Sequence, residues 1–499
     1  FRVILRATAL ATLAILVACQ LMPAYASPVA AGSVRPTQQT IEATSDDDRW
    51  DNRFALASPA SAPFTSVRSI AILGKDVYVG GRFTSAGGVG VSGIARWDGE
   101  TWSNVGGGVD YCRGVFCFPT VYALQVKGNE LIAGGNFGSI GGVTANKVAK
   151  WDGSNWSAIG DGVVICDGSD CMTVQSLALS GDDIYAVGNV LTDLKEIGGT
   201  LKVEGFARWD GHSWSPVGGG VTGDSVSASI NTIGVNGSDI YIAGNFKTAG
   251  STGANNIARW NGREWSALGS GVDGCLNSNP NISCSPYVAT IAINGSDVYA
   301  GGRFTTAGGA GANNIARWDG QNWHSLGSGA NGLVMKLAAY RGYVYAGGTF
   351  TEIDGVKANG IARFDGTTWS PVGSGVDGFV DVIEFSNDFM YVAGGFNAAG
   401  GKASYNIARW ALSEPARDPS LPKIAGISLA CQKLTILGEG FDEGAVLLLN
   451  GEPQKTRNDS QNPTAILIAK KAGRKIKQGD ILQVRNHDGK VSPEFVFAR

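Results

Sequence analysis

One pattern of apolar and polar residues returns along most of this chain. Its first copy is the segment 94–97, Ile-Ala-Arg-Trp, followed by Asp98-Gly99 and a second β-prone segment that begins near Trp102. Asp-Gly between two such segments is a strong hairpin signal, because both residues tolerate the positive φ of a tight turn. A two-residue turn would place Trp102 opposite Ala95, so that a large side chain meets a small one on a buried face. The pattern predicts a repeated β-hairpin.

Each hairpin is the second half of a longer repeat, with seven copies spaced about 50 residues apart. The first half contains a run of small and branched residues and then a Tyr-centred strand that ends in glycine, as in Asp76–Phe83. The small and branched runs are Val67–Ile72, Val121–Val126, Val174–Leu179, Ile230–Val235, Val288–Ile293, Val334–Ala339 and Val380–Phe385. Four short strands at this period are typical of the blades of a β-propeller.

The seventh repeat stops after Trp410 and lacks its fourth strand. The segment Arg49–Phe54 resembles the missing piece, and we align Phe54 near the second Trp of the hairpin. Propellers commonly close by pairing a strand from one terminus into the last blade, because this leaves no open sheet edge. We therefore expect residues 48–411 to form an all-β, seven-bladed propeller of four-stranded blades, with the N-terminal strand closing the last blade.

The residues that recur in each repeat resemble the sequence motifs of known protein families. The glycine pair after a Tyr strand, followed by spaced Trp residues, is similar to the kelch/galactose-oxidase class of seven-bladed propellers. More narrowly, segments such as 78–88 and 313–320 resemble a repeat family of exported bacterial surface proteins. The resemblance covers about residues 48–411 and implies the propeller fold.

A second, smaller domain is expected at the C-terminal end. Residues 412–422 hold three prolines and predict a stiff linker. Residues 423–499 lack Trp and contain short alternating strands, with Gly438-Glu-Gly440-Phe441 and Asn450-Gly451 in order. They resemble an IPT/TIG module, which implies a small Ig-like β-sandwich.

The first residues are typical of an export signal. Two arginines precede an apolar run, and Ala24-Tyr25-Ala26 fits a cleavage site, so we interpret residues 1–26 as a signal peptide. In the alternative, Leu16-Val-Ala-Cys19 resembles a lipobox and Cys19 carries a lipid anchor. Residues 27–47 are polar and are expected to form a disordered spacer. No other stretch is long and apolar enough for a membrane span, and the protein is expected to be secreted or at the cell surface.

Three close cysteine pairs fall in loops that follow a Trp hairpin. In an exported protein such pairs favour local disulfides, whereas zinc is the rival reading of their spacing. No histidine lies in these loops, and export favours oxidation. The predicted disulfide cysteines are Cys112 with Cys117, Cys166 with Cys171, and Cys275 with Cys284.

Two features recur in every repeat and invite a functional interpretation. A basic residue precedes the first aromatic of each hairpin and, taken as a ring, would grip an anionic polymer. We favour a structural role, with each side chain lying along its neighbouring strand and its charge at a turn carboxylate or in water. We likewise favour burial of the Trp rows between blades over a sugar-stacking surface. The basic residues are Arg96, Lys150, Arg208, Arg259, Arg317, Arg363 and Arg409.

Known kinds of catalytic site find little support. The copper site of galactose oxidase would need a Tyr-His pair and a second His, but the chain has only His212, His324 and His487 and no Tyr-His. The acidic residues Asp381 and Glu384 are not part of a recognisable catalytic motif. The Gly-Ser-Asp and Gly-Asp-Asp pieces before the Tyr strands suggest Asp turns rather than calcium loops. We expect no enzyme activity, no catalytic or metal-ligating residues and no cofactor.

The sequence therefore predicts a binding or scaffold protein. A net charge of −3 gives no reason to expect nucleic acid as a partner. Propeller loops would bind an extracellular protein or polysaccharide; the alternative is a carbohydrate-active protein that binds or cleaves a polysaccharide. The loops that differ most between repeats are 110–120, 161–173, 190–204 and 273–287, and three of them are the cysteine loops, which should share one face.

Overall fold

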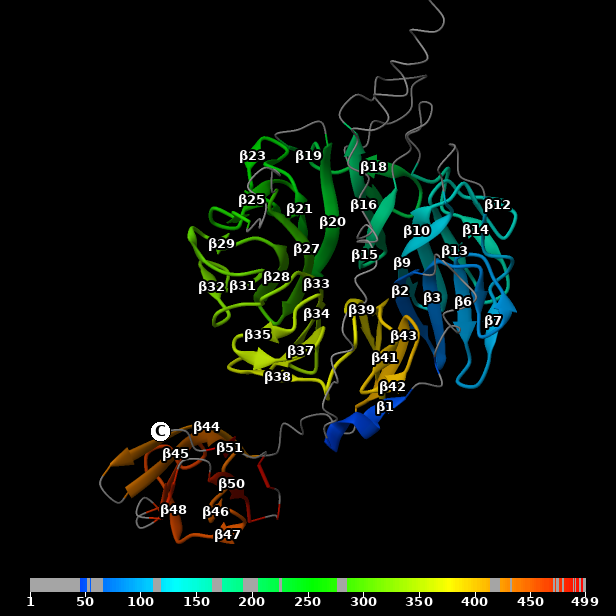
Figure 1. The fold of residues 1–499 in the computed structure, drawn as a ribbon. Coiled ribbons are helices and arrows are strands. Elements are labelled where there is room, and N and C mark those ends of the chain that lie inside the picture. The colour runs from blue at the N-terminus through cyan, green and yellow to red at the C-terminus, as the bar shows by residue number, and fades with distance from the viewer. Residues whose placement is uncertain are drawn as a thin grey trace, which may run out of the picture. The chain divides into compact units, whose positions relative to one another are not determined.

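Each sequence repeat folds into the same four-stranded antiparallel unit. The computed structural model describes residues 45–51, 54, 66–110, 118–163, 173–191, 205–223, 227–275, 285–412, 422–430 and 433–469, and parts of 472–496. Within each unit the strands pair in chain order, as in β2-β3-β6-β7, and the third and fourth units are joined because β16 also pairs with β20. Figure 1 places the first strands of the units toward the centre and the fourth strands at the periphery. The architecture is all-β and propeller-like.

The strand bounds repeat with little variation from unit to unit. The first strands are β2 (Ser66–Leu73), β9 (Thr120–Lys127), β15 (Val174–Ser180), β20 (Ser227–Asn236), β27 (Tyr287–Asn294), β33 (Val334–Tyr340) and β39 (Phe379–Phe385). The second strands are β3 (Asp76–Arg82), β10 (Glu130–Asn136), β16 (Asp183–Leu191), β21 (Asp239–Asn245), β28 (Asp297–Arg303), β34 (Tyr343–Gly348) and β40 (Phe389–Gly395). The third strands are β6 (Ile94–Trp97), β13 (Val148–Trp151), β17 (Phe206–Trp209), β24 (Ile257–Trp260), β31 (Ile315–Trp318), β37 (Ile361–Phe364) and β43 (Ile407–Ala411). The fourth strands are β7 (Trp102–Asn104), β14 (Trp156–Ala158), β18 (Trp214–Pro216), β25 (Trp265–Ala267), β32 (Trp323–Ser325), β38 (Trp369–Pro371) and β1 (Trp50–Asp51).

The last unit takes its fourth strand from the other end of the chain, as the sequence predicts. In β1, Trp50 pairs with Trp410 and Asp51 with Arg409 of β43. The alignment of Phe54 with the second Trp of the hairpin is wrong, because Trp50 holds that position. Phe54 instead lies in the core of the first unit, with ring centroids 5.6 Å from Trp97 and 5.0 Å from Trp102. The first strand β2 also contacts β39 and β40 of the last unit.

The Trp hairpins have longer turns than the predicted two residues. Trp97 pairs directly with Trp102, so four residues connect the strands and Ala95 faces Asn104. The Asp98 carboxylate accepts hydrogen bonds from the backbone N–H groups of Glu100 and Thr101, and these bonds hold its pKa at about 2. An Asp side chain that closes its own turn is the reason for the longer loop. Equivalent bonds are made by Asp152, Asp210, Asn261, Asp319 and Asp365.

Every first strand contains a β-bulge directly after its first buried Val or Ile. In the first unit the register jumps from Val67 to Ser69, which leaves Arg68 unpaired in the ladder. The jump recurs at the same place in each repeat. A bulge of this kind bends a strand and redirects one side chain. We call the bulged residue of each repeat the hub position; its occupants are Arg68, Tyr122, Gln175, Asn231, Ala289, Met335 and Asp381.

The bulge explains the glycines that end the Tyr strands. A Cβ on Gly81 would overlap the carbonyl oxygen of Ser66, and a Cβ on Gly244 would overlap that of Ser229. The equivalent glycine in each other repeat faces the same obstruction. The preceding glycine, where present, leaves room for the next unit, since a Cβ on Gly134 would meet Val174. The glycine opposite the bulge, which every repeat has, is thus a packing requirement of the bulged sheet.

Short hairpins between the second and third strands were not predicted. They pair in some repeats with the segment that leaves the preceding Trp hairpin, as β8 pairs β11. The three-stranded sets are β8 (Val109–Asp110), β11 (Ser139–Ile140) and β12 (Val143–Thr144); β19 (Val221–Thr222), β22 (Thr248–Ala249) and β23 (Thr252–Gly253); and β26 (Val272–Asp273), β29 (Thr306–Ala307) and β30 (Ala310–Gly311). The two-stranded sets are β4 (Ser85–Ala86) with β5 (Val89–Gly90), β35 (Glu352–Ile353) with β36 (Val356–Lys357), and β41 (Ala398–Ala399) with β42 (Lys402–Ala403).

The C-terminal residues form two four-stranded sheets around one core. One sheet has the order β44-β45-β49-β48 and the other β47-β46-β50-β51. Leu434 and Leu467 of the first sheet and Leu447 and Leu482 of the second belong to the same buried cluster. The strands are β44 (Lys423–Ala430), β45 (Lys433–Glu439), β46 (Val446–Leu449), β47 (Glu452–Pro453), β48 (Thr456–Asn458), β49 (Ile466–Ala469), β50 (Ile481–Arg485) and β51 (Phe495–Val496).

Several predictions lie outside the described residues. They are the signal peptide 1–26 with Cys19, most of the spacer 27–47, and most of the linker 412–422. In the part of the chain that the structure covers, none of the helices has the length and apolar character that crossing a bilayer requires. The only helix described N-terminal to β1 is a short 3-10 turn, η1 (Ser45–Arg49).

Candidate functional site

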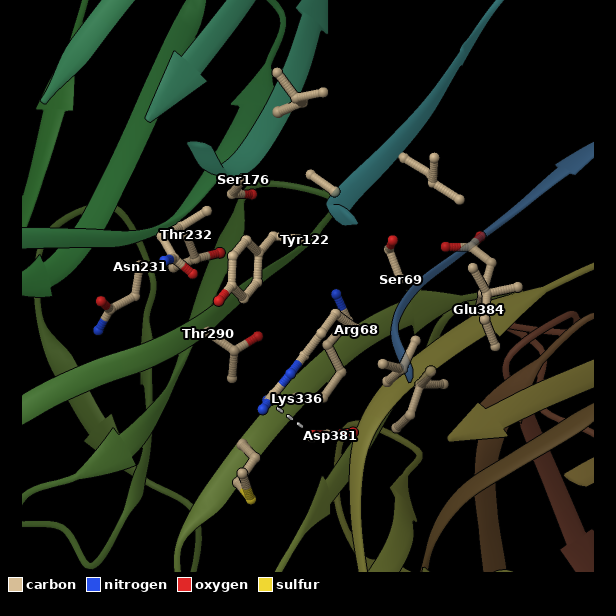
Figure 2. A pocket seen from close by; sticks show the side chains of 18 of the residues that line it. Arg68, Ser69, Tyr122, Ser176, Asn231, Thr232, Thr290, Lys336, Asp381 and Glu384 are labelled. Atoms are coloured by element: carbon tan, nitrogen blue, oxygen red, sulfur yellow. Dashed lines mark hydrogen bonds and ion pairs between the residues drawn. The ribbon is translucent and has the colours of Figure 1, made fainter. Parts of the chain in front are cut away.

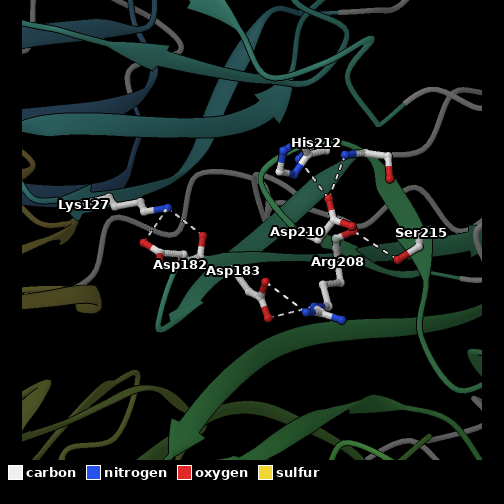
Figure 3. Close-up of polar contacts among 8 residues, drawn as sticks. Lys127, Asp182, Asp183, Arg208, Asp210, His212 and Ser215 are labelled. Carbon is white, nitrogen blue, oxygen red and sulfur yellow. Dashed lines mark hydrogen bonds and ion pairs between the residues drawn. The ribbon is translucent and has the colours of Figure 1, made fainter.

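The recurring basic residues bind carboxylates inside their own sheets. Arg96 donates to Asp76 at 2.7 Å, and in the closing sheet Arg409 donates to Asp51 at 2.6 Å. Figure 3 shows the equivalent pair of Arg208 with Asp183. The other pairs are Lys150–Glu130, Arg259–Asp239 and Arg317–Asp297. The predicted structural role of these cations is confirmed, and the same contacts occupy the acids of the Gly-Ser-Asp and Gly-Asp-Asp pieces.

One repeat departs from this pairing. Tyr343 stands where five other repeats have the acid at the start of the second strand, and the guanidinium carbon of Arg363 lies 5.3 Å from the Tyr343 ring centroid. This cation lies over an aromatic face, and Arg363 Nε also donates to Ser370 Oγ at 3.3 Å. The seven basic residues are therefore accounted for by contacts within their sheets.

The tryptophans pack between neighbouring units, as the sequence predicts. All thirteen are buried or half-buried. The indole N–H of Trp156 donates to the backbone carbonyl of Val105 in the preceding unit at 3.0 Å. Trp214, Trp265 and Trp323 make the same bond to Ile159, Gly218 and Leu268. These side chains hold adjacent sheets together and do not form a sugar-stacking surface.

A cavity of about 180 Å³ lies where the first strands converge. Every first strand contributes residues to its lining, and every hub position is among them. Figure 2 shows Tyr122, Asn231 and Thr232 together with Arg68, Lys336 and Asp381 around this space. A concave space lined by converging polar groups is the default place to look for a ligand.

The hub position differs in every repeat, although the residue before it hardly changes. The residue before it is always Val or Ile and is at most 1% exposed. At the hub itself the seven repeats carry Arg, Tyr, Gln, Asn, Ala, Met and Asp. Packing between sheets imposes one residue type at the first position and no common type at the second. The packing of the sheets therefore does not dictate the residue type at the hub positions.

Charge in the cavity is confined to three neighbouring strands. Arg68 comes from β2, Lys336 from β33, and Asp381 and Glu384 from β39. Arg68 Nη1 lies 3.4 Å from Asp381 Oδ2, whereas Asp381 Oδ1 has no hydrogen-bond partner in the described structure. Burial raises the pKa of Asp381 to about 6, against the opposing charges of Arg68 and Lys336. Burial also raises the pKa of the Glu384 carboxyl, and the charge of Lys336 opposes this.

The variable loops belong to two kinds of connection between strands. Loops 110–120, 161–173 and 273–287 each lead from a fourth strand into the next first strand, whereas 190–204 connects a second strand to a third. In an antiparallel sheet these two kinds of connection lie on the same side. The pairing of β8 with β11, and of β26 with β29, joins the two kinds directly. Residues 111–117, 164–172, 192–204 and 276–284 of these loops lie outside the described residues, so the common face of the cysteine loops stays a prediction.

The predicted disulfides stay predictions. Cys112, Cys117, Cys166, Cys171 and Cys284 lie outside the described residues, as does Cys431, and only Cys275 lies within them. Sequence reasoning did not identify the cavity, although it noted Asp381 and Glu384. The signal was present in the aligned first strands, where the hub position and the residue after it vary between one column of Val or Ile and a second column of Ile or Leu.

Comparison with known proteins gives limited likenesses. No protein-family profile matches the chain. Among curated proteins, "Polarized growth protein L1" of Phoma sp. is 32% identical over 116 residues, which are 23% of this chain and 8% of that protein. The chain thus spans less than a tenth of the length of that relative.

Among solved structures, "YCF48 bound to D1 peptide" is 14% identical with a TM-score of 0.32, covering 68% of this chain and 88% of that one. The β-propeller domain of the Trilobed protease from Pyrococcus furiosus is 11% identical with a TM-score of 0.38, covering 71% and 100%. The extracellular region of Plexin A4 is 9% identical with a TM-score of 0.33, covering 89% and 52%. The propeller-like architecture rests on the sheet topology, and likenesses at these TM-scores add no argument about function.

Proposed function

We propose that this chain is an exported, non-catalytic binding or scaffold protein. Its repeats form a closed seven-bladed propeller of the kelch/galactose-oxidase type, and residues 423–499 form an IPT/TIG module with an Ig-like fold. The contact of β2 with β39 and the β1–β43 pairing support the closed ring. The common core of the two C-terminal sheets supports the second domain. The partner is an extracellular protein or polysaccharide held by the variable loops.

One observation carries the binding role. Residues that hold the sheets together repeat, whereas the residues that do not repeat gather at the loops into the first strands and at the hub positions just after them. A rigid scaffold with variation at one end of its strands is the usual arrangement of a binding protein. The three predicted disulfides would stiffen the loops, and export would allow them to form.

The alternative of polysaccharide cleavage has one observation in its favour, since Asp381 and Glu384 line the same cavity. Glycosidases need one carboxyl group protonated and the other ionised. Here burial raises the pKa of both groups, both lie on one strand, and cationic Arg68 and Lys336 accompany them. Binding is the better supported role. A Glu384→Gln variant that abolished sugar release from a polysaccharide would reverse this conclusion.

The chain supplies its own control for testing the loops. The connection Val376–Phe379 between the last two repeats is short and lacks cysteine. Replacing 110–119, 164–172 and 273–286 with the residues Asp377-Gly378 of this connection should preserve the thermal transition, because the change removes all six loop cysteines and leaves the core residues and the first strands untouched. We expect the wild-type chain to bind one class in a screen of glycans, cell-wall polymers and surface proteins, and the short-loop variant to lose at least tenfold in affinity. Equal binding by both chains would contradict loop-based recognition.

A further inference from the structure

The cavity contains charged side chains of both signs, and one carboxylate oxygen among them has no hydrogen-bond donor in the described structure. Two cations, Arg68 and Lys336, and two acids, Asp381 and Glu384, line it, so their formal charges cancel. Arg68 lies beside Oδ2 of Asp381, while Oδ1 of that residue and the hydroxyl of Ser69 are buried without a hydrogen-bond partner in the described structure. A buried carboxylate oxygen without a donor is costly. The cavity therefore lacks a donor at Asp381.

The remaining wall has a different character. The strands β9, β15 and β20 contribute Tyr122, Gln175 and Asn231 at their hub positions, together with the hydroxyl of Thr232. These groups form hydrogen bonds but carry no charge. Figure 2 shows the Tyr122 hydroxyl, Asn231 and Thr232 grouped on this side of the space. A ligand that fits would have both charges close together at one end and a neutral polar group at the other.

We propose that the cavity binds a small polar α-amino acid. Its ammonium group donates to Asp381 Oδ1, its carboxylate lies between Arg68 and Lys336, and its side chain bonds to the neutral wall. A simple anion would leave Asp381 Oδ1 without a donor, and a simple cation would face two basic side chains. The cavity, with a volume of about 180 Å³, has room for a molecule the size of serine or threonine. This site is separate from the loop surface of the proposed function.

Calorimetric titration of the full chain with L-serine and L-threonine tests the proposal. The matched probes are ethanolamine, which has the ammonium alone, and glycerate, which has the carboxylate alone. We expect saturable binding of an amino acid, and an affinity for each single-charge probe that is lower by about tenfold or more. The reason is that losing one hydrogen bond to a charged group lowers the affinity by about that factor. Asp381→Asn and Lys336→Met should each weaken amino-acid binding by a similar factor. His324→Gln, at the sheet periphery, should leave it unchanged.

Two results would overturn the proposal. One is the absence of heat for any amino acid up to about 10 mM, where a ligand with a Kd near 1 mM would be detected. The other is binding of glycerate as tight as that of L-serine, which would identify a plain anion site. A thermal melt of each variant verifies folding, and Lys336→Met, which removes a single charge, serves if Asp381→Asn does not fold. Loop-dependent binding of a macromolecule is measured independently and survives either result.

Discussion

Deletion of residues 45–54 is expected to abolish the cooperative thermal transition of the propeller-like domain. The last sheet would lose its fourth strand, including the pairing of Trp50 with Trp410 and the ion pair of Asp51 with Arg409. Trp50 is 2% exposed and Phe54 is fully buried. Removing a buried aromatic costs about 3–5 kcal/mol, and two such losses approach the roughly 5–15 kcal/mol that stabilises a typical domain. Circular dichroism melts measure the effect.

The single substitution Phe54→Ala measures the contribution of one buried aromatic ring without removing strand β1. Phe54→Ala should destabilise by about 3–5 kcal/mol and lower the melting temperature by several degrees, because the ring contacts Trp97, Trp102 and Tyr391. Phe118→Ala is the matched control. Its ring is 51% exposed and lies over Arg82, so the expected loss is about 0.5–1 kcal/mol. Equal melting temperatures for the two variants would mean that burial of the Phe54 ring contributes little to stability.

Gly244→Ala is expected to have the second largest effect. The added Cβ would overlap the Ser229 carbonyl at the bulge of β20, and the obstruction is backbone that cannot move aside cheaply. Forced backbone shifts cost about 1–3 kcal/mol or more. Gly253→Ala in the same repeat is the control, because nothing lies within contact distance of its Cβ and its φ is ordinary. Chemical denaturation of both variants tests this, and a loss of stability for Gly253→Ala as large as that for Gly244→Ala would show that the bulge does not explain the glycine.

Repetition is why so much of the fold could be predicted. Each copy of the Trp hairpin gave the same evidence for third and fourth strands, and the missing strand after Trp410 pointed to the segment that includes Trp50. The basic residues and the tryptophans could also be assigned correctly, because a role that recurs in every unit belongs to the scaffold. Arg96 with Asp76 and Trp156 with Val105 are the contacts that confirm it.

Local geometry was less predictable. Asp98-Gly99 reads as a two-residue turn, but the Asp98 side chain captures two backbone donors and adds two residues to the loop. From the sequence we aligned Phe54, and not Trp50, with the second Trp of the hairpin. Both residues are aromatic, and the segment Arg49–Phe54 is too short to fix the strand register. At each bulge a backbone carbonyl of the first strand approaches a glycine of the second strand. This contact joins two strands, so the sequence of one strand alone does not predict it.

The candidate site was the least predictable part. Arg68 and Asp381 are separated by most of the chain and meet only because the first and last units are neighbours. In the sequence, Asp381 and Glu384 are two acids three positions apart. Their burial and the nearby cations follow from the convergence of the first strands around the cavity, which the sequence of a single repeat does not show.

The central claim is that repeated residues build the scaffold and the residues that do not repeat bind the ligands. A variant with R68A, Y122A, Q175A, M335A and D381A tests it most directly, because Ala289 already occupies the same position in one repeat. Removing Arg68 and Asp381 together leaves neither charge unpaired. Val380→Ala, at the adjacent buried position, is the comparison and should cost about 2 kcal/mol.

The decisive measurement is a thermal melt of the five-alanine variant followed by calorimetric titration with L-serine. We predict a cooperative transition within about 5 °C of wild type, since substitutions away from packed contacts each cost little, together with loss of amino-acid binding. A variant that unfolds, or one that binds as tightly as wild type, would contradict the claim.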